Sequence, residues 1–324
     1  MSSVITRRRF FRYCQLTAAA LGLDAAGLGL LRKALANPNA PTVVWLQGSS
    51  CTGCSISLLN LISDRIGEPA SVEAVAAEAV NLVFHPTLMA TAGEDAVASL
   101  LEAQKAGGYV LVVEGAVPLA FGGRACIAYS WRGREVTFQE VVQECAARAA
   151  KIVSVGTCAA FGGIPAAGAN PTQAVGVQTL TGRPVINVSG CPANPDWVVW
   201  VIVQLLLGKT IQLDENSRPI ALYAAKFDGS SAPAILHDKC PRNPGLHGVP
   251  IARQFGEDGH CLEQLGCRGP FTRARCEAAW NGIAGAVPPQ PHAAHWCIGV
   301  NAPCHGCVEK EFPGPKSFYE PYSG

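Results

Sequence analysis

The chain has 324 residues and a formal net charge of +1, and 49% of its residues are hydrophobic against 15% charged. This composition excludes a disordered chain, because so many apolar side chains must be buried, and the balanced charge argues against a nucleic-acid binder or a polybasic membrane binder. The length suits about two domains. Fourteen cysteines are too few for a disulfide-dense small protein and too many for an ordinary core, so metal or cluster ligation is the first hypothesis.

The N-terminal segment, residues 1–36, has the pattern of a twin-arginine export signal. Arg7 and Arg8 precede an apolar stretch rich in Ala, Leu and Gly over residues 16–31, and residues 34–36 offer a small-x-small cleavage site. The alternative is an amphipathic surface helix with a basic start. We favour the export signal and expect a periplasmic protein.

No later apolar run is long enough to cross a membrane as a helix, which takes roughly 20 residues. The run Val198–Leu207 comes nearest and is too short. We therefore expect a soluble mature chain with no transmembrane helix, at most peripherally attached to a membrane.

Between residues 42 and 207, short β-branched runs alternate with helical patterns. The five predicted strands are Thr42–Gln47, Asn81–Phe84, Tyr109–Val113, Lys151–Val155 and Pro184–Val188. The helical patterns between them include Ser55–Ile66, Ala92–Ala106 and Phe138–Ala149. This alternation predicts right-handed βαβ units and an α/β fold with a parallel sheet.

Ligands of such sheets gather beyond the carboxyl ends of the strands. The residues that follow the five strands in order are Cys51 and Cys54, His85, Glu114, Cys158 and Cys191. Four cysteines from three loops thus meet at one edge of the sheet, which predicts a cluster site there.

The Cys51-Thr52-Gly53-Cys54 element lies where the first strand turns into a helix. Free backbone N–H groups and the positive end of the helix dipole favour thiolates and a negatively charged cluster at this place. Alone, the motif could also be a thioredoxin-like redox pair or half of a zinc site. Cys158 and Cys191 in equivalent loops argue against the redox pair, because a dithiol catalyst needs no third and fourth cysteine.

From about residue 208 the periodic pattern disappears, and the chain becomes dense in Pro, Gly and Cys. A segment of this kind can barely form a hydrophobic core of its own, so cross-links such as bound metal or disulfides must stabilise it. Its potential ligands form two groups, His237, Cys240, Cys261 and Cys267, then Cys276, Cys297, Cys304 and Cys307. Each group offers four soft ligands, the number that a cubane iron–sulfur cluster needs. Zinc could use the same ligand types, whereas the very short spacings suit disulfides poorly.

These motifs together resemble the small, electron-transferring subunit of periplasmic [NiFe] hydrogenases over nearly all of the chain after the signal. The matching segments are Trp45-Leu46-Gln47-Gly48-x-x-Cys51-Thr52-Gly53-Cys54-Ser55, Phe84-His85-Pro86-Thr87, Val113-Glu114-Gly115, Gly156-Thr157-Cys158, Gly190-Cys191-Pro192, His237-x-x-Cys240, Cys261-x5-Cys267 and Cys304-x-x-Cys307. The resemblance implies a flavodoxin-like domain, here residues 37–207, followed by an irregular iron–sulfur domain, here residues 208–324.

The resemblance also implies the ligands of three clusters. The proximal [4Fe–4S] cluster takes Cys51, Cys54, Cys158 and Cys191, and the distal one takes His237, Cys240, Cys261 and Cys267. The medial cluster takes Cys276, Cys304 and Cys307. Many relatives have a proline at the position of Cys297 and hold a [3Fe–4S] centre, so Cys297 predicts a third [4Fe–4S] cluster, as in the [NiFeSe]-type small subunits.

The implied function is electron relay for a dihydrogen oxidoreductase. H2 would be cleaved at a nickel–iron or nickel–iron–selenium site of a large partner subunit, and this chain itself carries no catalytic residue. Electrons would leave through the distal cluster to a c-type cytochrome or a membrane-bound redox subunit. Two alternatives are a complex I-type quinone-reducing module, which shares the flavodoxin-like half, and an exported zinc-binding structural or interaction protein.

Several residues near these motifs have simpler interpretations. We expect Cys126 and Cys145 to be inert thiols in the interior. His85 is expected to pack or hydrogen-bond near the large-subunit interface rather than to bind metal. Glu114 could act near the proximal cluster or the interface, or could simply accept backbone N–H groups. Oxygen-tolerant relatives have extra cysteines where this chain has Gly53 and Gly163.

Overall fold

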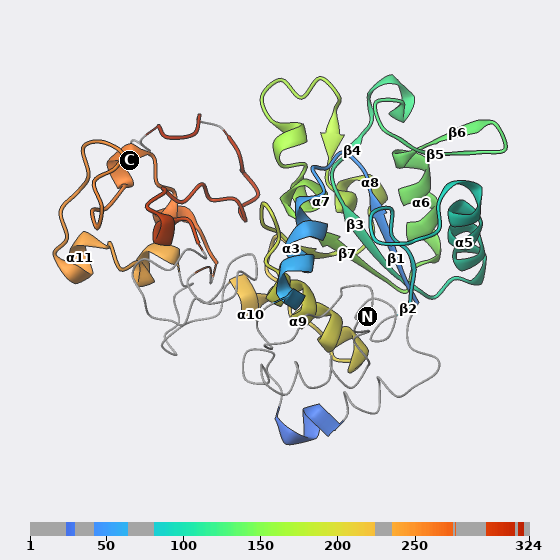
Figure 1. Cartoon of the computed structure of the whole chain (residues 1–324), viewed down its shortest axis with the longest axis horizontal. Helices are drawn as coiled ribbons and strands as arrows, with labels where there is room; N and C mark the ends of the chain where they lie inside the picture. The colour runs from blue at the N-terminus through green and yellow to red at the C-terminus, as the bar shows by residue number, and fades with distance from the viewer. Residues whose placement is uncertain are drawn as a thin grey trace.

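The computed structural model describes residues 24–29, 42–63, 81–223, 235–274, 276, 296–314 and 317–320. Its centre is a five-stranded parallel sheet in the order β2-β1-β3-β7-β9 (Figure 1). The strands of this sheet are β1 (Thr42–Gln47), β2 (Asn81–Phe84), β3 (Val110–Glu114), β7 (Lys151–Val155) and β9 (Ile186–Val188). This is the strand order of flavodoxin-like sheets, and the predicted α/β fold is confirmed.

Helices cover both faces of the sheet, which explains why its strands are almost continuously apolar. Val44 and Leu46 of β1 face one core, while Val43 and Trp45 of the same strand face the other. The first core is closed by α5 (Gly93–Ala106) and α6 (Phe138–Arg148), and the second by α3 (Gly53–Ser63) and α9 (Pro195–Leu206) (Figure 1). The shorter helices α7 (Thr157–Phe161) and α8 (Val177–Thr181) lie on the side of the first core.

Three of the predicted strands have the predicted ends, whereas the others are shifted. Strand β3 runs from Val110 to Glu114 instead of from Tyr109 to Val113, because Glu114 continues the ladder opposite Gln47. Strand β9 starts at Ile186 rather than Pro184, since proline has no N–H to donate to a ladder. The first helix starts at Gly53, two residues earlier than predicted.

Two small antiparallel pairs carry no clear signal in the sequence. One is the hairpin of β5 (Ile127–Trp131) and β6 (Arg134–Thr137), and the other pairs β4 (Val117–Pro118) with β8 (Ala174–Val175). Thr137 ends the hairpin and caps α6, with Glu140 completing a capping box. The hairpin therefore leads directly into a core helix.

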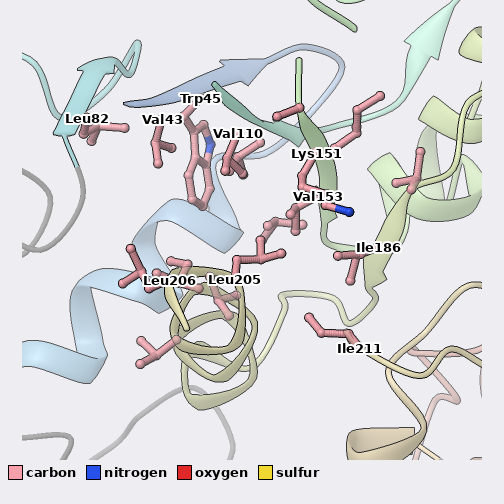
Figure 2. Close-up of a pocket in the computed structure, with 18 of the residues that line it drawn as sticks. Val43, Trp45, Leu82, Val110, Lys151, Val153, Ile186, Leu205, Leu206 and Ile211 are labelled. Carbon is pink, nitrogen blue, oxygen red and sulfur yellow. The ribbon is translucent and has the colours of Figure 1, made fainter. Parts of the chain in front are cut away.

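An apolar cavity of about 470 Å³ lies between the sheet and α9 (Figure 2). Val43 and Trp45 project into it from β1, and Leu205 and Leu206 from α9. No cysteine lines this cavity, so it is separate from the predicted ligand sites.

After α9 the described chain has only short turns of helix. They are α10 (Ile220–Tyr223), η3 (Leu236–Lys239), α11 (Pro244–His247), η4 (Glu263–Leu265), η5 (Gly269–Phe271) and η6 (Ile298–Val300). Cys240, Cys267 and Cys304 pack with Leu236 and Trp296 in a third small core. The cysteine-rich, irregular character predicted for this half is thus confirmed.

One prediction falls largely outside the described residues. It is the export signal, of which only residues 24–29 are described. Among the described residues, no helix combines the length and apolarity that crossing a membrane requires.

Candidate functional site

The structure brings the four predicted proximal cysteines to one edge of the sheet. Cys51 precedes α3, Cys54 lies in its first turn, Cys158 lies in α7 after β7, and Cys191 follows β9. The thiol of Cys158 interacts electrostatically with those of Cys51 and Cys191, and the thiol of Cys54 with those of Cys158 and Cys191. Cys51 is exposed, while the other three are partly buried.

Glycines make room for these sulfurs. A Cβ atom at Gly156 would lie 2.5 Å from the Cys54 sulfur, and the φ of Gly156 is +90°. A Cβ atom at Gly53 would lie 3.0 Å from the Cys51 sulfur, and one at Gly163 would lie 3.1 Å from the Cys158 sulfur. The positions where oxygen-tolerant relatives have extra cysteines thus border this site directly.

Glu114 anchors the Cys51–Cys54 turn to the sheet. Its carboxylate is buried and accepts hydrogen bonds from the backbone N–H groups of Cys54 (3.1 Å) and Ser55 (3.4 Å). It also accepts from the Ser55 hydroxyl (2.5 Å), the Trp45 indole (3.2 Å) and the Ser50 hydroxyl (3.3 Å). Glu114 therefore both lies near the proximal set and accepts backbone hydrogen bonds, because the donating N–H groups belong to Cys54, a predicted ligand, and to its neighbour Ser55.

His85 is a buried structural residue, as the sequence led us to expect. Its Nδ1 atom accepts hydrogen bonds from the backbone N–H groups of Thr87 (3.1 Å) and Leu88 (3.3 Å). Its Nε2 atom lies 3.3 Å from the Ser55 hydroxyl, and its ring lies 5.0 Å from the Trp45 ring. Burial lowers the pKa of His85 to about 4, so the ring is neutral and reaches the proximal edge through its contacts with Ser55 and Trp45.

Burial disfavours the charged form of the proximal thiols. The pKa of Cys158 is raised to about 12, first by burial and then by the neighbouring Cys191 thiol. The pKa of Cys54 is raised for the same main reason, although the Ala193 N–H donates to its sulfur at 3.4 Å and opposes the shift. Four thiolates held this close need a positive partner. Iron bound between them would supply that charge, so the donor set fits an iron–sulfur cluster.

The four predicted distal ligands line one small cavity. His237 lies on η3, Cys240 follows it, and Cys261 and Cys267 flank η4. The Cys267 thiol interacts electrostatically with those of Cys240 and Cys261. A Cβ atom at Gly269 would lie 3.5 Å from the Cys267 sulfur and 4.0 Å from Nδ1 of His237. The imidazole and the thiol therefore face the same space.

The predicted medial cysteines lie between the other two sets. The thiol of Cys307 interacts with that of Cys297, and the thiol of Cys304 with that of Cys307. Cys276 packs against the core that includes Cys304 and against the core that Cys307 borders. Burial raises the pKa of Cys297 to about 11 and that of Cys307 to about 12, so this donor set also calls for a positive partner.

Backbone N–H groups link the three sets to one another. The N–H group of Cys191, in the proximal set, lies near the Cys307 sulfur of the medial set and opposes the rise of the pKa of that thiol. The N–H group of Cys304, in the medial set, donates to the sulfur of Cys267 in the distal set at 3.2 Å. Spacing alone could not predict these contacts, because they join segments that are distant in sequence.

The remaining described cysteines lie apart from these sets. Cys145 is fully buried on α6, and burial raises its pKa to about 11. Cys126 is partly buried and precedes β5. Within the described ranges, no three His, Cys, Asp or Glu side chains close around a position suited to a single metal ion.

Comparisons with known proteins agree with this geometry. Residues 51–205 match the family described as NADH ubiquinone oxidoreductase, 20 Kd subunit, and residues 233–320 match the C-terminal family of the NiFe/NiFeSe hydrogenase small subunit. The chain is 35% identical to the periplasmic [NiFeSe] hydrogenase small subunit of Desulfomicrobium baculatum, over 97% of this chain and 98% of that one. It is 34% identical to the periplasmic [NiFe] hydrogenase small subunit of Solidesulfovibrio fructosivorans, over 95% and 90% of the two chains.

A solved structure shares the fold as well. The [NiFeSe] hydrogenase of Desulfovibrio vulgaris Hildenborough matches with a TM-score of 0.73 and 34% identity. The match covers 88% of this chain and 99% of that one. Fold, cysteine sets and sequence similarity therefore point to one family.

Proposed function

The chain belongs to the family of [NiFe] and [NiFeSe] hydrogenase small subunits, and we propose from this membership how its residues carry out the family's electron transfer. A small subunit of this family relays electrons between the H2-activating site of the large subunit and a redox partner. Similarity over both halves of the chain excludes the complex I-type module, whose resemblance is confined to the first half, and nothing supports a zinc-binding structural protein. The convergence of twelve predicted ligands in three adjacent sets is the observation that carries the proposal.

Membership of the family implies iron–sulfur clusters, and the three sets suggest their number and type. Each set holds four donors, which is the complement of one [4Fe–4S] cluster. The proximal set is Cys51, Cys54, Cys158 and Cys191, the medial set is Cys276, Cys297, Cys304 and Cys307, and the distal set is His237, Cys240, Cys261 and Cys267. When bound, such clusters accept and release single electrons.

The residues of this chain control charge at each set. At the proximal set the Ala193 N–H stabilises charge on the Cys54 sulfur, whereas the Cys54 and Ser55 N–H groups at the start of α3, which the sequence suggested would be free, bind Glu114. His237 would bind as a neutral imidazole, so the distal set carries one negative charge fewer than an all-cysteine set. This difference should raise the reduction potential at the end where electrons leave.

The exposed proximal edge is the proposed docking face for the large subunit. Cys51 is exposed there, and the nearby apolar side chains of Ile56 and Ile164 are 51% and 46% exposed. Exposed apolar groups beside a partly open ligand site favour a permanent partner over solvent. At the distal end we propose a c-type cytochrome or a membrane-bound redox subunit.

Location and domain division complete the proposal. Relatives named as periplasmic and the Arg7-Arg8 motif support export by the twin-arginine pathway, followed by removal of residues 1–36. Residues 37–207 would then form the domain of the proximal set, and residues 208–324 the domain of the other two. The separate family matches to residues 51–205 and 233–320 support this division.

Coexpression with the cognate large subunit tests the proposal. The purified pair should be brown, contain about twelve iron atoms in this chain, and reduce viologen dyes with H2. Cys267→Ser should lower the iron content, whereas Cys145→Ser, the matched buried control, should not. A colourless zinc-containing protein would overturn the proposal.

A further inference from the structure

The contacts between ligand sets suggest where electrons cross from one set to the next. The backbone N–H of Cys191 lies near the Cys307 sulfur, and Cys304 donates its N–H to the Cys267 sulfur at 3.2 Å. At each crossing, therefore, the backbone of a ligand residue lies beside a ligand sulfur of the neighbouring set. Hydrogen bonds to cluster sulfurs also tune the reduction potential.

The hydroxyl group of Thr157 lies at the first crossing, where Cys191 of the proximal set meets Cys307 of the medial set. Thr157 is 1% exposed, and its hydroxyl oxygen accepts the N–H of Gly190 at 2.8 Å. The same hydroxyl donates to the carbonyl oxygen of Cys307. Thr157 precedes Cys158, and Gly190 precedes Cys191, so this single hydroxyl touches or adjoins ligands of both the proximal and the medial set.

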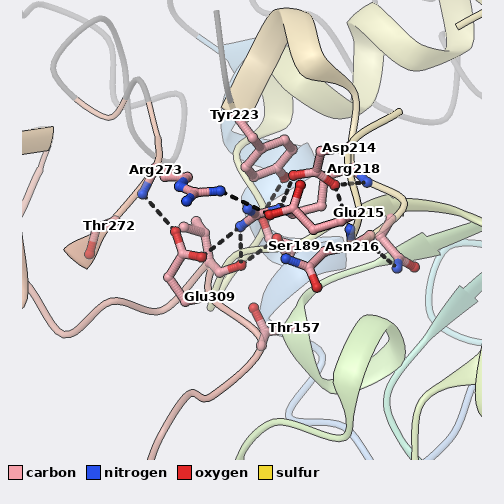
Figure 3. Close-up of polar contacts among 12 residues, drawn as sticks. Thr157, Ser189, Asp214, Glu215, Asn216, Arg218, Tyr223, Thr272, Arg273 and Glu309 are labelled. Carbon is pink, nitrogen blue, oxygen red and sulfur yellow. Dashed lines mark hydrogen bonds and ion pairs between the residues drawn. The ribbon is translucent and has the colours of Figure 1, made fainter. Parts of the chain in front are cut away.

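Further contacts hold Val308 and Glu309, the two residues after Cys307, in place without involving a predicted ligand residue (Figure 3). The Ser189 hydroxyl donates to the Val308 carbonyl at 2.7 Å, and Arg218 donates to the same carbonyl at 3.1 Å. Arg218 also pairs with Glu309 at 3.0 Å. These contacts hold the segment after Cys307 against the sheet domain, so loss of the Thr157 contacts alone need not release it.

We propose that Thr157 is a positioning residue that sets the contact between the proximal and medial ligand sets, and thereby the electron exchange between them. In this exchange one electron would pass from a reduced cluster held by the proximal set to an oxidised cluster held by the medial set. H2 oxidation in the large subunit supplies the electron, and the external acceptor finally takes it. The proposal rests on the ligand sets assigned above.

Thr157→Val and Thr157→Ser separate the hydroxyl from the shape of the side chain. Valine keeps the branched shape but leaves the Gly190 N–H and the Cys307 carbonyl without this partner. Serine keeps the hydroxyl and loses only a methyl group. Both variants should be prepared as the complete complex with the large subunit, and their iron content should be measured first.

Two measurements then report on electron exchange between the proximal and medial sets. The first is the ratio of H2-driven benzyl viologen reduction to H/D exchange, because exchange takes place in the large subunit and does not need the relay. The second is the magnetic interaction between reduced proximal and medial clusters in EPR spectra, which reports their separation without turnover. We expect Thr157→Val to lower the ratio about tenfold and to alter the magnetic interaction, and Thr157→Ser to resemble the wild type.

The outcomes distinguish failure of this inference from failure of the proposed function. An iron-loaded, active wild type whose Thr157→Val variant keeps both the ratio and the EPR interaction would overturn the role of Thr157 alone. A wild type without iron or H2 activity would overturn the proposed function. If Thr157→Val loses iron, a matching loss in Thr157→Ser would assign Thr157 to packing and contradict the proposal.

Discussion

Under the proposed ligand assignment, Cys297 is the residue on which the iron content of the medial set would depend. It precedes η6, and its thiol interacts electrostatically with those of Cys267 and Cys307. A thiol in this position can hold a fourth iron, whereas the proline of many relatives cannot. Cys297 would therefore distinguish a medial [4Fe–4S] cluster from a [3Fe–4S] cluster.

We predict that Cys297→Pro converts the medial cluster to [3Fe–4S] while the fold survives. The φ of Cys297 is −53°, within the range that a proline ring allows. Oxidised [3Fe–4S] is paramagnetic and oxidised [4Fe–4S] is not, so EPR of the oxidised variant should show a signal near one per protein. The wild type should show none. A stoichiometric signal in the intact wild type would exclude Cys297 as a ligand.

His85 makes stability depend on pH at the proximal edge. The folded protein holds the ring neutral with a pKa of about 4, while an unfolded chain takes the proton at the ordinary pKa of 6.5. The stabilisation is therefore complete above pH 6.5 and is lost progressively as the pH falls toward 4.

We predict that acidification from pH 6.5 to about pH 5 costs the wild type about 2 kcal/mol more than His85→Asn. The asparagine carbonyl can replace Nδ1 as acceptor for Thr87 but takes no proton. Denaturant unfolding of the loaded complex at both pH values measures the difference. Equal acid sensitivity of the two proteins would show that His85 is not the titrating group.

At the scale of elements, sequence periodicity predicted the central sheet well because buried parallel strands are short apolar runs. The ends of β1, β2 and β7 agree with the structure, whereas the start of α3 does not. That helix begins early because Glu114, about sixty residues away along the chain, binds the N–H groups of Cys54 and Ser55. Local patterns cannot report such a distant partner.

The second half was less predictable for a related reason. Its short turns have no periodic face, and the cysteines pack into its small core. The sequence indicated which residues could form ligand groups, and the structure brings these groups near one another. The role of Thr157 had no signal beyond its place before Cys158, because its partners lie in two distant segments.

The buried Arg218 ties the segment after Cys307 to the part of the chain that follows α9. Its side chain is 0% exposed and pairs with Asp214 at 2.9 Å and with Glu309 at 3.0 Å. Its guanidinium also lies 4.9 Å from the centre of the Tyr223 ring. Removing the guanidinium would leave the largely buried carboxylates of Asp214 and Glu309 without this positive charge.

We predict that Arg218→Met lowers the free energy of unfolding by about 3–5 kcal/mol, the usual cost of breaking a buried ion pair on one side. The matched control is Arg273→Met, which breaks an exposed pair with Glu215 and should cost less than about 1 kcal/mol. Denaturant unfolding of both variants measures these costs. Similar values for the two would argue that Arg218 contributes no more than a surface residue.

At the scale of the whole molecule, the signal segment should serve two chains at once. The resemblance implies a large subunit without a signal of its own, so the folded pair would cross the membrane on the Arg7-Arg8 motif of this chain. This requires the pair to assemble, with its metal groups, before export.

We predict that Arg7→Lys combined with Arg8→Lys leaves both subunits and the H2 activity in the cytoplasm. Immunoblots and H2-dependent viologen reduction in periplasmic and cytoplasmic fractions measure the distribution. The matched control is Arg9→Lys, which leaves the twin-arginine pair intact. A large subunit that still reached the periplasm without this chain would contradict the shared signal.

The open proximal edge also bears on how a cell must balance production of the two subunits. Cys51, Ile56 and Ile164 are exposed in this chain, and only a bound partner would shield them. A copy made in excess would expose an apolar surface and an oxidisable thiol to proteases and to other unassembled copies. We therefore expect surplus copies to be short-lived, so that the steady-state amount of this chain follows the supply of its partner rather than its own rate of synthesis.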